Sequence, residues 1–248
     1  MAASAVPLPA TRNRLLSALP RDLLAQLWPR LEPVELALHE VLHEVGKPIA
    51  FVLFPETSSV SMLAYLEDGD AAEVGIIGRE GIIGIAVLLG AGRDDLEALV
   101  QNPGTALRME AGAFRDALDA HPAFRALLLR YAHVHHTQVA RTAACNAHHS
   151  IEQRFARWLL ISHDGAEGDT FPMTQEFLSM MLGVRRAGIS SSAAGLRRAG
   201  MIDYAAGQMT VTDRPGLESV ACECYGVARR ASDRLFGPPG GARGPYRA

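Results

Sequence analysis

Two adjacent arginines follow a short apolar segment that ends in a glycine. Arg185 and Arg186 come just after Gly183, and Ser190 and Ser191 follow about one helical turn later. Guanidinium groups can bind phosphate, or guanine through two parallel hydrogen bonds. At the N-terminal part of a helix, these residue types are typical of a surface that enters the major groove of duplex DNA.

Two short helices are expected to position these side chains. Thr174 is a good N-cap for the first helix, and Gly183 permits the tight turn that joins it to the second. In the second helix, the apolar residues at 189, 193 and 196 share one face, so Ala187, Ser191, Ala194 and Arg198 lie on the opposite, outward face. The candidate DNA contacts are Arg185, Arg186, Ser190, Ser191 and Arg198, with Thr174 and Gln175 at the N-terminus of the first helix.

A hairpin follows the second helix. Met201–Tyr204 and Met209–Val211 flank the residues 205–208, a strand–turn–strand pattern that predicts the wing of a winged helix-turn-helix. An αα-hairpin packed inside a core, with a hairpin beside it, is the alternative interpretation. The charge of the C-terminal part supports DNA binding only weakly. Residues 151–248 carry 12 basic and 10 acidic residues, whereas residues 1–150 carry 12 basic and 17 acidic residues.

Histidines and cysteines suggest metal or redox chemistry, but their spacing gives it little support. His133 and His136 are three residues apart, which suits a metal, yet no carboxylate or thiol accompanies the pair at diagnostic spacing. Cys222 and Cys224 within a terminal helix would point their thiols in different directions, so we expect reduced, inert thiols. No cofactor is evident, and His135, His148 and His149 are expected to be exposed.

Composition and motifs exclude other classes of protein. The chain has no phosphate-binding loop, dinucleotide fingerprint, zinc-hydrolase motif or nucleophile elbow, and Ser190–Ser192 has no base partner, so we expect no enzyme. No apolar run is long enough for a membrane span, and residues 1–10 do not resemble an export signal. Three cysteines are an odd number for a disulfide framework. We therefore expect a cytoplasmic protein without a membrane partner.

The segments before the two short helices predict a β domain and one long helix. Short apolar runs separated by glycines between Leu36 and Met109 are typical of a β roll. Arg12–Leu31 predicts a helix that Pro20 divides. Pro122–Ala144 predicts a long helix that packs on its own β domain, on a second copy of itself, or on both. The stripe expected to form the dimer interface consists of Leu127, Tyr131, Val134 and Gln138.

The predicted fold class is α+β, with five segments. They are an N-terminal helical segment (1–30), an antiparallel, jelly-roll-like β roll with a sensor role (31–120), a dimerisation helix (121–147), a winged helix-turn-helix (148–236) and a disordered tail (237–248).

Seven stretches of the chain carry a resemblance to a known family. They are Phe54-Pro55-Glu56, Gly78-Arg79-Glu80-Gly81-Ile82-Ile83-Gly84, Cys145-Asn146-Ala147-His148-His149-Ser150, Arg157-Trp158-Leu159-Leu160, Thr174-Gln175-Glu176-Phe177-Leu178, Met181-Leu182-Gly183-Val184-Arg185-Arg186 and Ala221-Cys222-Glu223-Cys224-Tyr225. With the order of the predicted parts, they resemble the Crp/Fnr transcription regulators over about residues 35–235. The resemblance implies a cyclic-nucleotide-binding-like roll and a homodimer on a near-palindromic duplex site, with RNA polymerase as a further partner.

The effector residues of that family are only partly present. Nucleotide-binding members use a Gly-Glu pair and an Arg-Ser or Arg-Thr pair, whereas here Ile82 follows Gly81 and two aspartates follow Arg93. We therefore do not expect cyclic AMP. The residues Gly81, Ile82, Gly84 and Arg93 would form either a vestigial pocket or a pocket for another small-molecule effector.

Two other family sensors are not expected either. No cysteine precedes Cys145, which argues against the N-terminal iron–sulfur cluster of the oxygen-sensing members. Haem-sensing members use a histidine ligand in the roll, for which His39 and His43 are the candidates here. Haem is not expected, because surface histidines are much more common than haem ligands. The sequence thus predicts a DNA-binding regulator; the alternative is an effector-binding module whose helix-turn-helix contacts proteins.

Overall fold

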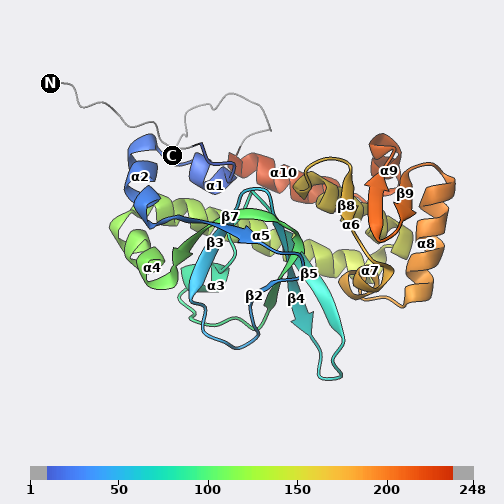
Figure 1. Cartoon of the computed structure of the whole chain (residues 1–248), viewed down its shortest axis with the longest axis horizontal. Coiled ribbons are helices and arrows are strands. Elements are labelled where there is room, and N and C mark those ends of the chain that lie inside the picture. Colours follow the sequence, from blue (N-terminus) through green and yellow to red (C-terminus); the bar gives the residue numbers. More distant parts are fainter. Residues whose placement is uncertain (1–9, 237–248) are drawn as a thin grey trace.

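The computed structural model describes residues 10–236 of the 248-residue chain, so the tail predicted to be disordered lies outside the described residues. The N-terminal part is a β roll of two antiparallel sheets, with strand orders β1-β7-β3 and β2-β6-β4-β5 (Figure 1). This arrangement confirms the expected α+β fold class. The strands are β1 (Glu32–Leu36), β2 (Val41–His43), β3 (Phe51–Pro55), β4 (Ser59–Tyr65), β5 (Ala71–Ile77), β6 (Glu97–Asn102) and β7 (Gly104–Glu110).

Alternating side chains of the two sheets form the core of the roll. Val60 and Met62 of β4 face the same interior as Ile77 of β5 and Val100 of β6, and all four are buried. Because successive residues of a strand point to opposite faces, this alternation determines which side chains enter the core between the sheets. The turn between β4 and β5 contains Gly69 at φ +89°, a backbone conformation that favours glycine.

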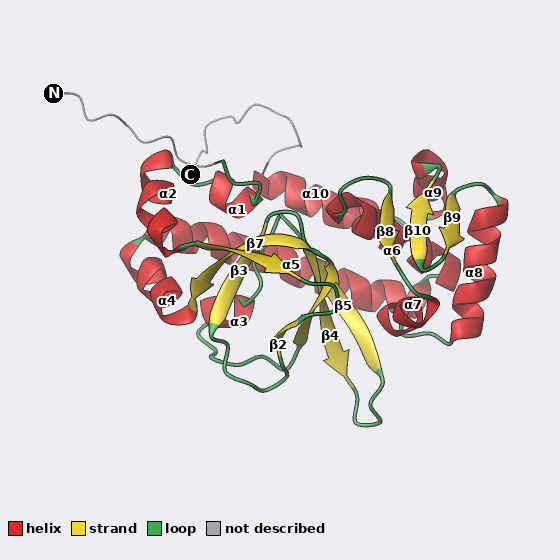
Figure 2. Ribbon diagram, in the orientation of Figure 1, coloured by secondary structure: helices red, strands yellow, loops and turns green. Residues whose placement is uncertain are grey.

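Helices cover one side and one end of the roll. Pro20 separates α1 from α2, which confirms the expected break in the N-terminal helix. α5 is 27 residues long, about 40 Å, and runs along the roll to the C-terminal domain (Figure 2). The helices of this part are α1 (Arg14–Ser17), α2 (Arg21–Leu27), the 3-10 helix η1 (Trp28–Arg30), α3 (Ile85–Leu88), α4 (Ala111–Ala120) and α5 (Pro122–His148).

The apolar stripe of α5 packs on the chain's own β roll. Leu127, Tyr131 and Val134 are all buried within the protomer and belong to the core that joins α5 to the N-terminal helices. At Gly81 the contact is so close that an added Cβ would lie 2.0 Å from Tyr131 Oη. The structure therefore corrects the assignment of these three side chains to a dimer contact, because the protomer itself covers them. Gln138 lines a cavity described below.

The C-terminal part is a helical domain with a three-stranded sheet in the order β8-β10-β9. Its last helix, α10, packs back along α5 (Figure 1). Within residues 10–236, no helix combines the length and apolar character needed to cross a membrane. The elements are α6 (Ile151–Gly165), β8 (Thr170–Pro172), α7 (Gln175–Leu182), α8 (Arg186–Arg198), β9 (Ile202–Ala205), β10 (Gln208–Val211), α9 (Arg214–Val220) and α10 (Cys224–Phe236).

Candidate DNA-binding interface

The helix-turn-helix consists of α7 and α8, joined where the sequence predicted the turn. Thr174 is the N-cap of α7, and its Oγ1 accepts a hydrogen bond from the backbone N–H of Phe177 at 3.1 Å. Gly183 ends the helix at φ +58°, in the left-handed region. Both local predictions are confirmed, and they set the angle at which the chain enters α8.

One face of α8 is buried in the domain, and the opposite face is exposed to solvent. Ile189, Ala193 and Leu196 are buried against α6 and the small sheet. Ser191 and Ala194 lie on the outward face and are exposed. Figure 1 shows α8 at the edge of the molecule, away from the β roll.

The arginines at the start of α8 are both exposed. Arg185 is the N-cap residue, and Arg186 is the first residue of the helix. Arg186 Nη2 lies 2.6 Å from Glu176 Oε1 of α7, and the two side chains are 61% and 79% exposed. Ion pairs this exposed contribute little to stability, so the guanidinium can exchange the carboxylate for a phosphate or a base at small cost.

The remaining predicted contacts lie on α7 and α8. Ser190 Oγ donates a hydrogen bond to Gln175 Oε1 at 2.9 Å, and this bond links α8 to α7. Thr174 is exposed at the N-terminus of α7, beside Gln175. Arg198 is exposed at the far end of α8, one helix length from Arg185. The structure thus gathers six of the seven residues near the N-terminal part of α8 and leaves Arg198 apart.

The wing is a two-residue hairpin. β9 pairs with β10, with Ala205 opposite Gln208, and the turn consists of Ala206 and Gly207 at φ +51° and +74°. Positive φ at both turn residues matches the twist of the two strands. Ala205 and Ala206 are exposed and carry no charge, so these two positions offer no basic side chain to a nucleic acid.

The expected effector residues do not line the large cavity of this molecule. That cavity, of about 570 Å³, lies between the roll, α6 and α10, and Glu73, Arg157 and Trp158 are among its lining residues. Of the expected residues, Ile82 is fully buried, and Arg93 donates a hydrogen bond to the Gly46 carbonyl at 2.8 Å on the exposed surface. The assignment of Gly81, Ile82, Gly84 and Arg93 to an effector pocket stays a prediction.

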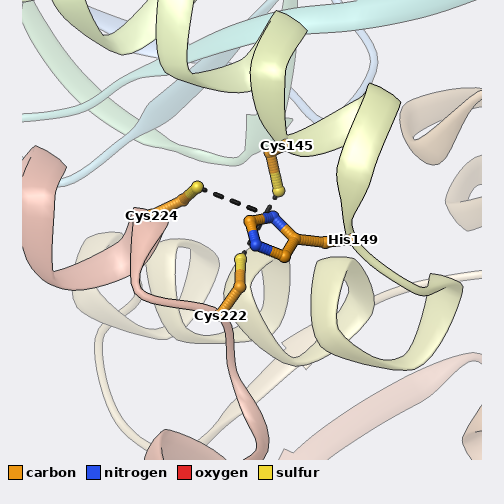
Figure 3. A group of neighbouring side chains, drawn as sticks. All are labelled: Cys145, His149, Cys222 and Cys224. Carbon is orange, nitrogen blue, oxygen red and sulfur yellow. Dashed lines mark hydrogen bonds between the residues drawn. The ribbon is translucent and has the colours of Figure 1, made fainter.

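The structure also brings together four side chains that the sequence did not connect. Ligand atoms of Cys145, His149, Cys222 and Cys224 all lie within 4.8 Å of one another (Figure 3). The expectation that Cys222 and Cys224 point apart is wrong, because α10 begins only at Cys224 and Cys222 precedes it in non-helical backbone. The i, i+4 spacing of Cys145 and His149 was the signal that could have indicated this cluster.

Comparisons with known proteins agree with this geometry. Residues 153–220 match the model of the Crp-like helix-turn-helix domain. No curated protein matches the chain by sequence.

Solved structures of Crp/Fnr regulators share the fold over most of the chain. FixK2 from Bradyrhizobium japonicum is 14% identical with a TM-score of 0.66, over 77% of this chain and 98% of that protein. A CRP-family regulator from Thermus thermophilus is 20% identical with a TM-score of 0.63, over 76% and 96%. The c-di-GMP responsive global regulator CLP of Xanthomonas campestris is 12% identical with a TM-score of 0.61, over 77% and 99%. The chain therefore contains a Crp-like helix-turn-helix domain and has the overall fold of the Crp/Fnr transcription regulators.

Proposed function

We propose that the protein is a sequence-specific transcription regulator that binds duplex DNA as a homodimer. The observation that carries this proposal is the open face of α8. It presents Arg185, Arg186 and Ser191 to solvent while its apolar residues are buried in the same domain. A helix with that orientation at the edge of a domain fits the major groove, whose base edges guanidinium and hydroxyl groups can read.

A second copy of the chain would make the site near-palindromic. In dimeric helix-turn-helix proteins, the two reading helices bind half-sites about 34 Å apart, one turn of the duplex. The exposed side of α5 offers a surface for such a dimer, since Leu129 is 44% exposed there and lines a groove with His133 and Leu235. RNA polymerase and a small-molecule effector are further partners that we infer from the family fold.

Selection of bound sequences from random duplex DNA by the full-length protein tests this function. We expect an enriched motif with two related halves. Arg186→Ala should weaken binding to that motif by about 1–3 kcal/mol and relax the preference at one position in each half. Arg21→Ala, which changes an exposed arginine on α2, serves as the control and should bind like the wild type.

Two outcomes would contradict the proposal. Recovery of no motif at all would favour a helix-turn-helix that contacts proteins. An Arg186→Ala variant that selects the same motif with the same affinity would exclude Arg186 as a base-reading residue, and the open face of α8 would then need another role.

A further inference from the structure

The four side chains of Figure 3 form a donor set with the dimensions of a metal site. Cys145 Sγ lies 3.5 Å from Cys222 Sγ, and Cys224 Sγ lies 3.7 Å from His149 Nδ1. A tetrahedral zinc ion with bonds of about 2.3 Å to sulfur and 2.0–2.1 Å to nitrogen separates its ligand atoms by roughly 3.5–3.8 Å. We propose that Cys145, His149, Cys222 and Cys224 bind one zinc ion.

The imidazole of His149 is oriented as a metal ligand would be. Its Nδ1 faces the thiols, while its Nε2 lies 3.2 Å from Glu223 Oε2 on the opposite side of the ring. Metal-binding histidines commonly donate their second ring N–H to a carboxylate, which fixes the ring and leaves the first nitrogen free to bind the ion. Glu223 lies between Cys222 and Cys224 in the chain, so one short segment supplies two ligands and this supporting carboxylate.

Two arginines compensate the charge of the site. Three thiolates and one divalent zinc ion carry a net charge of −1, which is unfavourable in a buried place without a cation. Arg154 and Arg157 of α6 are buried, and the positive charge of each acts on Cys145. Their Nη2 groups donate hydrogen bonds to the Leu182 carbonyl and to Thr142 Oγ1, whereas the two Nε atoms have no hydrogen-bond partner within the described part of the chain. Their placement therefore suits a site that holds negative charge.

The number and spacing of the ligands favour a closed, mononuclear site. All three thiols are buried, and four protein ligands are the number that a closed tetrahedral zinc site requires, which leaves no position for a substrate. An iron–sulfur cluster would distribute its thiolates over several iron atoms, whereas here every ligand atom lies within 4.8 Å of the others. These three cysteines are all that the chain contains.

The ion would connect the two ends of the C-terminal domain. Cys145 and His149 lie at the end of α5, just before α6 begins at Ile151, whereas Cys222 follows α9 and Cys224 is the first residue of α10. The ligands thus span the junction between the long helix and the helix-turn-helix. We expect zinc to hold that junction in one arrangement, and its loss to weaken DNA binding; this second step rests on the proposed function.

Metal analysis of the full-length protein, purified under reducing conditions without chelator, tests the site directly. We expect about one zinc per chain, and far less in Cys222→Ser and His149→Gln. His148→Gln is the matched control, because His148 is the neighbouring histidine, is exposed and lies outside the cluster; it should retain the zinc. Far-ultraviolet circular dichroism of each variant shows whether the fold is kept.

Cobalt substitution provides a readout that does not depend on the folding of a variant. Metal-free wild type titrated with Co²⁺ should develop thiolate charge-transfer bands and the intense visible bands of a tetrahedral ion, with a stoichiometry of one. His149→Gln should shift the visible bands, and His148→Gln should not. Reduced wild type that binds neither Zn²⁺ nor Co²⁺ would overturn the proposal, and so would inorganic sulfide in the purified protein or a Cys145–Cys222 disulfide that persists in reductant.

Measurement of DNA binding distinguishes the metal site itself from its proposed effect on DNA binding. Zinc-loaded protein that binds no DNA sequence would contradict the proposed function but leave the metal site intact. Metal-free protein that binds the selected motif as tightly as the loaded form would contradict the coupling alone.

Discussion

Arg186 and Glu176 face each other across the turn of the helix-turn-helix, with Nη2 and Oε1 2.6 Å apart. The Glu176 carboxylate forms an ion pair with the guanidinium that we expect to contact DNA. It also places a negative charge where the phosphates of DNA would approach. The proposed interface therefore carries its own competitor for Arg186.

Removal of that competitor should strengthen DNA binding. Glu176→Gln is expected to lower the Kd for the selected motif severalfold at low salt, with a smaller gain at higher ionic strength, because screening reduces the repulsion. Fluorescence anisotropy at several salt concentrations measures this effect. Glu44→Gln changes an exposed acid of the roll and serves as the control. A Glu176→Gln variant that binds more weakly at low salt would show that the carboxylate positions Arg186 instead of competing for it.

Glu73 should make the stability of the protein depend on pH. Burial raises the pKa of Glu73 to about 8, although Ser61 Oγ and Trp158 Nε1 donate hydrogen bonds to it at 2.6 and 2.9 Å. The folded state therefore binds a proton that the unfolded state releases above about pH 4.5. Stability should fall as pH rises from about 4.5 to 8, by up to roughly 1.4 kcal/mol per pH unit, and show no further loss from this group above pH 8.

The Glu73→Gln variant tests this dependence. A neutral amide can accept from Trp158 and donate to Ser61, so the variant should lose this component of the pH dependence and exceed the wild type in stability near pH 9. Urea denaturation between pH 5 and 9 gives the free energies of unfolding, and Glu44→Gln should follow the wild type. If the free energies of unfolding of Glu73→Gln and the wild type changed with pH in the same way, Glu73 would be excluded as the titrating group.

The wing can be stabilised at one residue. Ala206 adopts φ +51°, which costs an L-residue other than asparagine or aspartate about 1–2 kcal/mol. Ala206→Asn creates an asparagine–glycine turn, the preferred pair for this hairpin, and should raise the free energy of unfolding by about 0.5–1 kcal/mol. Ala205→Asn, in the adjacent strand position, should give no gain. Equal effects of the two substitutions in thermal unfolding would show that the turn conformation is not the cause.

The exposed side of α5 should mediate dimerisation. Leu129→Arg introduces a charge into the apolar surface that we assign to a second copy, and light scattering during gel filtration should detect monomers. Leu89→Arg is the matched control, since Leu89 is also an exposed leucine, 64% accessible, but lies at the end of α3 in the roll. A dimer that survives Leu129→Arg would place the contact elsewhere, with α10 as the next element to test.

The sequence alone determined the helix-turn-helix, because its signals are local. An N-cap at Thr174, a glycine at 183 and the apolar spacing of Ile189, Ala193 and Leu196 each act within a few residues. Such signals define where a helix begins, where it ends and which of its faces is buried. The open face of α8 could therefore be predicted residue by residue.

Only the tertiary structure decided what covers each buried face and which distant residues meet. The stripe of α5 predicted a covered side, but periodicity cannot tell the chain's own roll from a second copy, and the protomer buries Leu127 and Tyr131 itself. Likewise, Cys145 and Cys222 are 77 residues apart in the chain, and their thiols meet only because α10 folds back along α5. Contacts of that separation depend on the packing of whole elements, which no local spacing encodes.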